Sequence, residues 1–159
     1  MNRVDLARLA RLSQAARAHP RLRMNENLHA MQDPIHRLLN ATEPGTYVQP
    51  HRHLDPAKVE TLSVIRGRGA VLVFDDRGGL VERATLSLAG PDLVLEIPAG
   101  AWHSLVALEP GTVWFEVKPG PYVPPPPADV ASWAPAPNSP EAPRYLEHML
   151  FLVRTERNR

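Results

Sequence analysis

The sequence predicts an all-β fold of the sandwich or barrel type, and three observations lead to this prediction. Between residues 23 and 119 the chain is a succession of short runs rich in Val, Leu, Ile, Thr and aromatic residues, separated by turn signals such as "DDRGG", "AGPD" and "PAGA". No helical crossover lies between the runs, which argues against a parallel α/β sheet. The length of 159 residues suits a single domain.

Helical and proline-rich segments flank the expected strands. Apolar residues recur at helical spacing before the "HP" at 19–20, so we expect an N-terminal helix in residues 1–22 and the strands in 23–120. Ten prolines fall among the 25 residues from Pro119 to Pro143, which predicts an extended surface arm over 121–143. Residues 144–159 have one apolar helical face, and we expect this C-terminal helix to dock on its own barrel or on a neighbouring subunit.

Composition narrows the class of partner. The 18 basic and 17 acidic residues give a net charge of +1, too even to indicate a nucleic acid or an anionic membrane as partner. The absence of cysteine excludes disulfides, thiolate nucleophiles and cysteine-ligated metal sites. The N-terminal arginines interrupt any signal-peptide-like run, and no apolar run is long enough to span a membrane, so we expect a cytoplasmic protein.

The stretch "PGTYVQPHRHLDPAKVE", residues 44–60, carries the candidate chemistry. If "YVQPHRH" is a strand, His51 and His53 project to the same face, because side chains alternate along a strand. Glu60 would open the next strand, and His103 enters another strand after the "PAG" turn. Three imidazoles and one carboxylate suit a divalent first-row ion. The alternative is that the two histidines are ordinary polar side chains in an exposed loop.

The order of these residues resembles the two signature motifs of the cupin superfamily, G-x5-H-x-H-x3–4-E-x6-G and G-x5-P-x-G-x2-H-x3-N. Here the first motif runs from Gly45 through both histidines and Glu60 to Gly67, and the second contains "PAGAWH". Six residues separate His53 from Glu60, so the loop "LDPAKV" must bulge, and Ala107 stands at the final asparagine position. The resemblance implies a double-stranded β-helix, the cupin jelly-roll barrel, with a metal ion inside.

A narrower resemblance covers approximately residues 1–135. "NENLH", "HRLLNATEPGTYVQPHRH", "VIRGRGAVLVFDDRG" and "EIPAGAWHSLVALEPGTVWFEVKPGPY" look like the WbuC family of bacterial cupin metalloproteins. That family is associated with O-antigen gene clusters, which implies a role in surface-polysaccharide or nucleotide-sugar metabolism. The resemblance implies no particular reaction. By analogy with other cupins, and because the C-terminal helix has an apolar face to cover, we expect a homodimer.

The functional expectation is a small-molecule enzyme that holds one divalent transition metal (Fe, Mn, Zn or Ni) on His51, His53, Glu60 and His103. The alternatives are an Fe(II)-dependent dioxygenase and a non-enzymatic, metal-dependent ligand-binding module. No catalytic residue is assigned. On the last expected strand, "TVWFEVK", ordinary burial preference places Phe115 and Val117 in the core, and the reverse would bring Glu116 and Lys118 to the pocket.

Overall fold

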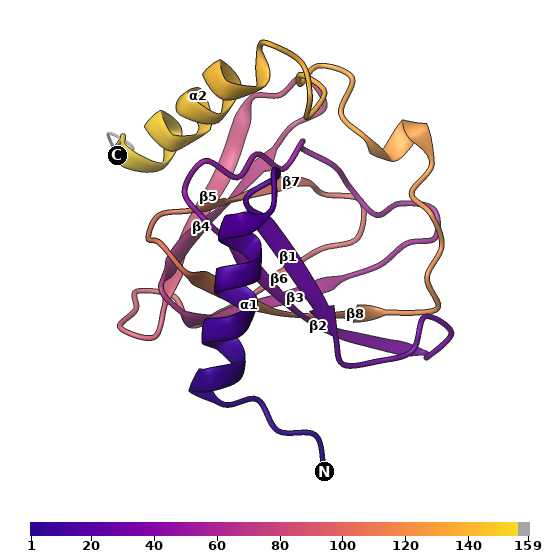
Figure 1. The fold of residues 1–159 in the computed structure, drawn as a ribbon. Coiled ribbons are helices and arrows are strands. Elements are labelled where there is room, and N and C mark those ends of the chain that lie inside the picture. Colours follow the sequence, from indigo (N-terminus) through magenta and orange to yellow (C-terminus); the bar gives the residue numbers. More distant parts are fainter. Residues whose placement is uncertain (156–159) are drawn as a thin grey trace.

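The computed structural model describes residues 1–155, which form two antiparallel β-sheets flanked by helices (Figure 1). In chain order the elements are α1 (Leu6–Ala18), β1 (Arg23–Asn27), β2 (Ile35–Thr42), β3 (Glu60–Arg66), β4 (Arg68–Phe74), β5 (Leu80–Ser87), β6 (Val94–Ile97), β7 (Trp102–Ala107), β8 (Thr112–Pro119), the short 3-10 helix η1 (Pro127–Asp129) and α2 (Ala142–Arg154). The prediction of an all-β fold with a helix before and after the strands is confirmed.

The two sheets face each other across an apolar interior. One sheet has the strand order β1-β2-β8-β3-β6 and the other β5-β4-β7, and every neighbouring pair is antiparallel. The indole of Trp114 is fully buried between the sheets. Its ring occupies space that only a glycine at position 69 leaves open, because a Cβ there would lie 2.1 Å from the ring. The other buried side chains of this layer are Leu62, Val64, Val71, Leu86 and Ile97.

Helix α1 covers the outer face of the five-stranded sheet. The Asp5 side chain accepts a hydrogen bond from the Arg8 backbone N–H at 2.8 Å and so caps the first turn. The buried face of the helix packs against β2 and β8, in a cluster formed by Leu9, Leu12, Ala16, Leu39, Ala41 and Val113. Strand β8 is therefore covered on both faces, by α1 outside and by the interior layer inside.

The proline-rich arm and α2 cover the outer face of the three-stranded sheet (Figure 1). The Trp133 ring lies 5.4 Å from the Phe74 ring and 6.1 Å from the Trp102 ring, measured between centroids. Leu146 and Met149 of α2 are buried in the same cluster. The C-terminal helix therefore docks on its own chain, the first of the two expected positions. Neither helix has the length and apolar character needed to cross a membrane within residues 1–155.

The segment expected as the strand "TYVQPHRH" has no regular strand structure. His51 makes isolated antiparallel bridges on two sides, to His103 of β7 and to Val130 of the arm. Pro50 has no N–H to donate to a ladder, although its carbonyl accepts from the Ala131 N–H at 2.9 Å. The strand prediction was wrong here, and the arm is more than a surface appendage, because it pairs with the segment that carries His51.

Candidate metal centre

Three histidines converge in the interior between the sheets. His51 and His53 come from the irregular segment, and His103 comes from the second position of β7. One ring nitrogen from each lies within 4.8 Å of the corresponding nitrogens of the other two. His103 is buried, whereas His51 and His53 are partly exposed. The group could hold a metal ion, and the clustering that the His-x-His spacing predicted is present.

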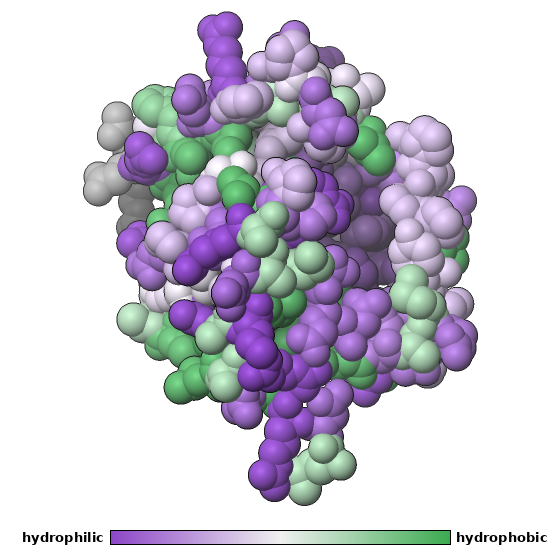
Figure 2. Space-filling view, viewed as in Figure 1, coloured by the Kyte–Doolittle hydropathy of each residue, from purple (hydrophilic) through white to green (hydrophobic). Residues whose placement is uncertain are grey.

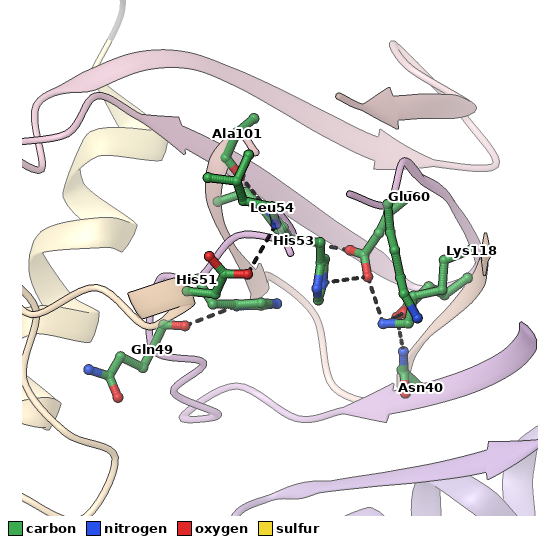
Figure 3. Close-up of polar contacts among 12 residues, drawn as sticks. Asn40, Gln49, His51, His53, Leu54, Glu60, Ala101 and Lys118 are labelled. Atoms are coloured by element: carbon green, nitrogen blue, oxygen red, sulfur yellow. Dashed lines mark hydrogen bonds and ion pairs between the residues drawn. The ribbon is translucent and has the colours of Figure 1, made fainter. Parts of the chain in front are cut away.

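Backbone carbonyls orient two of the three rings. His51 Nδ1 lies 3.1 Å from the Gln49 carbonyl oxygen, and His103 Nδ1 lies 2.9 Å from the Ala101 carbonyl oxygen (Figure 3). A carbonyl only accepts, so each Nδ1 carries the proton and each Nε2 has its lone pair free in the neutral ring. Metal-binding histidines are commonly oriented in this way. Burial, then the neighbouring His103, lowers the pKa of His51 to about 3, which keeps this ring neutral.

His103 and His53 show that a cation fits at this point. His103 Nε2 faces Glu60 Oε2 at 3.2 Å while its Nδ1 faces a carbonyl, and a neutral imidazole can donate to only one of these acceptors. His53 Nε2 lies 2.9 Å from Glu60 Oε1, yet this buried nitrogen has no aligned hydrogen-bond partner. A metal ion would satisfy both rings in their neutral form. The donor set therefore fits a divalent transition metal.

Glu60 is the first residue of β3 and lies against the histidines rather than away from them. Its carboxylate contacts His53, His103 and the Lys118 ammonium, the last at 2.6 Å (Figure 3). Burial opposes ionisation, but these contacts with the two imidazoles and the positive charge of Lys118 hold the pKa of Glu60 well below its usual range. The longer loop before Glu60 therefore does not displace it from the histidine group. Its role as a metal ligand is a proposal.

Glu116 and Lys118 line the cavity beside the histidines, so the expectation that Phe115 and Val117 form the core side of β8 was wrong. Lys118 Nζ lies 2.6 Å from Glu116 Oε1, and Asn40 Nδ2 donates to Glu116 Oε2 at 2.6 Å. Burial and the nearby Glu60 raise the pKa of Glu116. Phe115 instead packs on the outer face, under α1. Because β8 is covered on both faces, burial preference alone does not tell which of its two alternating sets of side chains faces the interior.

The cavity has a volume of about 250 Å³ and contains polar groups from both halves of the chain. Its lining includes the three groups His51, Glu60 and His103 of the centre, Glu116 and Lys118 of β8, and the side chains around β1 and β2. Figure 2 shows a hollow among hydrophilic residues on this face of the molecule, beside the position of β1 in Figure 1. Water and small solutes can therefore reach the centre.

The arm holds the segment between the histidines by its backbone and by Asp129. The Asp129 carboxylate accepts from the backbone N–H groups of Leu54 and Asp55 at 3.0 and 3.3 Å, and from Arg52 Nε at 3.1 Å. Arg52 also lies over the Trp102 ring, 4.4 Å from its centroid. Asp129 was not identified from the sequence, because an acidic residue in a proline-rich run carries no signal of its partner.

Comparison with solved structures shows the fold. Procruciferin, an 11S globulin from Brassica napus, matches with a TM-score of 0.52 and 21% identity over 65% of this chain and 26% of its own, so this chain spans about a quarter of it. KdgF from Halomonas sp. matches at 20% identity over 64% of this chain and 80% of its own, with a TM-score of 0.49. A cupin superfamily protein from Desulfitobacterium hafniense, DSY2733, matches at 14% identity over 61% and 76%, with a TM-score of 0.48.

The fold is the cupin jelly roll, two antiparallel sheets with a helix at each end. The chain belongs to the family described as "Domain of unknown function (DUF6016)", whose pattern matches residues 4–86. No curated protein matches the sequence. The cupin fold expected from the motifs is thus confirmed, and the narrower resemblance to the WbuC family stays a prediction.

Proposed function

We propose that this protein is a metal-dependent enzyme acting on a small molecule, with His51, His53, Glu60 and His103 as the ligands of one divalent ion. The observation that carries the proposal is the convergence of three imidazoles and a carboxylate at a cavity, where the buried His53 Nε2 lies 2.9 Å from Glu60 Oε1 without an aligned hydrogen bond. Fe, Mn, Zn and Ni all suit this donor set.

A divalent ion held there would act as a Lewis acid that polarises an oxygen of the substrate. The chain's own groups do the rest. Lys118 and Glu116 lie beside the centre. The Lys118 ammonium lies 2.6 Å from an oxygen of Glu60 and 2.6 Å from an oxygen of Glu116, so the two carboxylates share one positive charge. Burial would lower the pKa of Lys118, but the two carboxylates raise it, so Lys118 stays a protonated hydrogen-bond donor at the cavity. Asn40 fixes Glu116 by donating to its second oxygen.

The resemblance to the WbuC family supports a substrate from surface-polysaccharide or nucleotide-sugar metabolism. The same proposal includes a homodimer and a cytoplasmic location. It also includes a division of the chain into residues 1–22, 23–120, 121–143 and 144–159. The first alternative, an Fe(II)-dependent dioxygenase, has the same ligands. The second, a ligand-binding module, uses the same cavity without turnover.

The experiment is a turnover screen on protein loaded separately with each of the four metals. Sugar isomerisation and oxygen uptake are followed with sugar, enol and diol substrates, for the parent and for His51→Ala. Turnover that needs metal and is lost in His51→Ala is expected. Oxygen consumption by the iron form alone would move the assignment to the dioxygenase. Thermal stabilisation by a compound that is never converted would move it to the binding module, and full activity in His51→Ala would refute the ligand assignment.

A further inference from the structure

Two arginines at one edge of the cavity have no part in the centre described above. Arg23 is the first residue of β1, the edge strand of the five-stranded sheet, and pairs with Thr42 of β2. Directly opposed residues in an antiparallel pair point to the same face. Thr42 is buried on the interior side, where its hydroxyl accepts from Trp114 Nε1, so Arg23 also faces the interior. Arg21, two residues earlier, lines the same cavity.

Neither guanidinium has an acidic partner among residues 1–155. Arg23 is partly buried, and no ion pair or side-chain hydrogen bond joins it or Arg21 to the carboxylates of the cavity, which contact Lys118 and the histidines instead. Burial, then the neighbouring Arg21, lowers the pKa of Arg23. Glu147 of α2 lines the adjoining groove but forms no ion pair with either arginine. A partly buried cation without a counterion carries a cost that an anionic ligand would remove.

The backbone between the arginines is fixed in an uncommon conformation. Leu22 has a φ of 53°, in the left-handed region, where a residue other than glycine costs about 1 kcal/mol or more. Three hydrogen bonds hold it there: its N–H donates to the His19 carbonyl, and its own carbonyl accepts from Glu43 N–H and Thr46 Oγ1. Both arginines therefore extend from a constrained backbone, which needs no rearrangement when their side chains bind a ligand.

Charge and size define the ligand class. The cavity lining holds three basic side chains, Arg21, Arg23 and Lys118, against the two acids Glu60 and Glu116. A divalent ion on the histidines would make the excess of positive charge larger. The volume of about 250 Å³ is below the range of roughly 300–1,000 Å³ typical of sites for drug-sized ligands, which favours a compact metabolite over a whole nucleotide sugar.

We propose that the cavity binds a small organic anion, whose carboxylate or phosphate group is held by Arg21 and Arg23 while another of its oxygens is directed at the histidine centre. The guanidinium fork matches the oxygens of either group in a bidentate manner. This inference rests on the proposed function, because it names the substrate class of the same cavity.

The test is calorimetric titration with succinate, 3-phosphoglycerate and neutral glycerol. Each is titrated into zinc-loaded and chelator-stripped protein, for the parent, Arg23→Gln, Arg21→Gln and the control Arg77→Gln. Arg77 is an exposed residue of the turn between β4 and β5 and lies outside the cavity, so its substitution makes the same change in net charge. Circular dichroism and zinc content check that each variant folds and keeps its metal.

At least one of the two anions should bind the parent, and Arg23→Gln should weaken it roughly tenfold or more, because a hydrogen bond to a charged group is lost. Arg21→Gln should weaken binding less, since Arg21 is exposed, and Arg77→Gln should leave it unchanged. The weaker anion binding of Arg23→Gln should appear both in zinc-loaded and in chelator-stripped protein. Whether succinate or 3-phosphoglycerate binds more tightly identifies the group that is held.

The inference is overturned if no anion binds either form, if glycerol binds as well as the anions, or if Arg23→Gln and Arg77→Gln have the same effect. Failure of the proposed function looks different. In that case the protein retains no zinc, and anion binding that depends on Arg23 persists in the stripped protein.

Discussion

His51 and His103, which come from opposite halves of the sequence, exchange both of their backbone hydrogen bonds. His51 N–H donates to the His103 carbonyl at 3.0 Å, and His103 N–H donates to the His51 carbonyl at 2.8 Å. The two rings lie 4.5 Å apart between centroids. The backbone pairing therefore sets the spacing of two of the three imidazoles before any ion is bound, and we expect preorganised metal binding.

The arm should contribute to metal affinity through Asp129. Replacing Asp129 with Ala leaves the N–H groups of Leu54 and Asp55 without their acceptor, directly after His53, and leaves Arg52 without its ion pair. We expect a loss of about 1–3 kcal/mol in the free energy of unfolding and a metal dissociation constant roughly 10–100-fold higher. Urea unfolding in chelator and competitive metal titration measure the two effects.

Glu109→Ala is the matched control, because it removes an exposed carboxylate whose side chain makes no contact with the arm or the centre. Its metal affinity should equal that of the parent. Parent-like affinity in Asp129→Ala would show that the arm only covers the sheet.

Alkaline pH should destabilise the contacts that Tyr47 makes with the arm and with α2. Tyr47 donates to the Pro135 carbonyl at 2.8 Å, and its ring meets that of Tyr145. Burial raises the pKa of both tyrosines, with Tyr145 adding to the effect on Tyr47. The unfolded chain releases these protons near pH 10 while the folded chain retains them, so stability present below pH 10 is lost as the pH rises above it.

Tyr47→Phe removes one of these ionisations. The drop in urea midpoint between pH 8 and pH 11 should therefore be smaller in Tyr47→Phe than in the parent, although the variant starts from a lower stability at pH 8. Equal drops in the two proteins would contradict a buried, protonated Tyr47.

Lys118 should be needed to hold two carboxylates together. Its ammonium lies 2.6 Å from an oxygen of Glu60 and 2.6 Å from an oxygen of Glu116. Removing one partner of a buried ion pair costs about 3–5 kcal/mol, and because the Lys118 side chain is 23% exposed we expect about 2–4 kcal/mol for Lys118→Met. Adding Glu116→Gln removes one of the stranded charges and should recover part of this loss. Urea unfolding at neutral pH in chelator measures both, and a double variant no more stable than the single one would refute the shared pairing.

The sequence predicted the parts of the centre whose spacing is local. His51 and His53 are two residues apart, and His103 follows a recognisable turn, so their convergence could be expected from motif order. Trp114, Glu116 and Lys118 could not be assigned a face, because α1 supplies a second apolar layer against which Phe115 packs. Which face of β8 is interior depends on a packing partner that is distant in the sequence.

The role of the arm was unpredictable for a related reason. Prolines correctly indicated an extended segment outside the sheets, but composition does not tell which exposed edge such a segment meets. In the structure the arm pairs with the segment that carries His51. Val130 forms a β-bridge with His51, and the Ala131 N–H donates to the Pro50 carbonyl. The charge of Arg23 was likewise visible in the sequence, whereas its lack of a partner could be seen only in three dimensions.

Elemental analysis of untagged protein purified without chelator tests the central claim most directly. The parent and His148→Ala, which removes an exposed imidazole on α2, should each contain about one equivalent of a divalent transition metal, and the His51→Ala/His53→Ala variant should contain none. The same metal content in all three proteins, or no metal in the parent after incubation with each of Fe, Mn, Zn and Ni, would contradict a metal centre on these histidines.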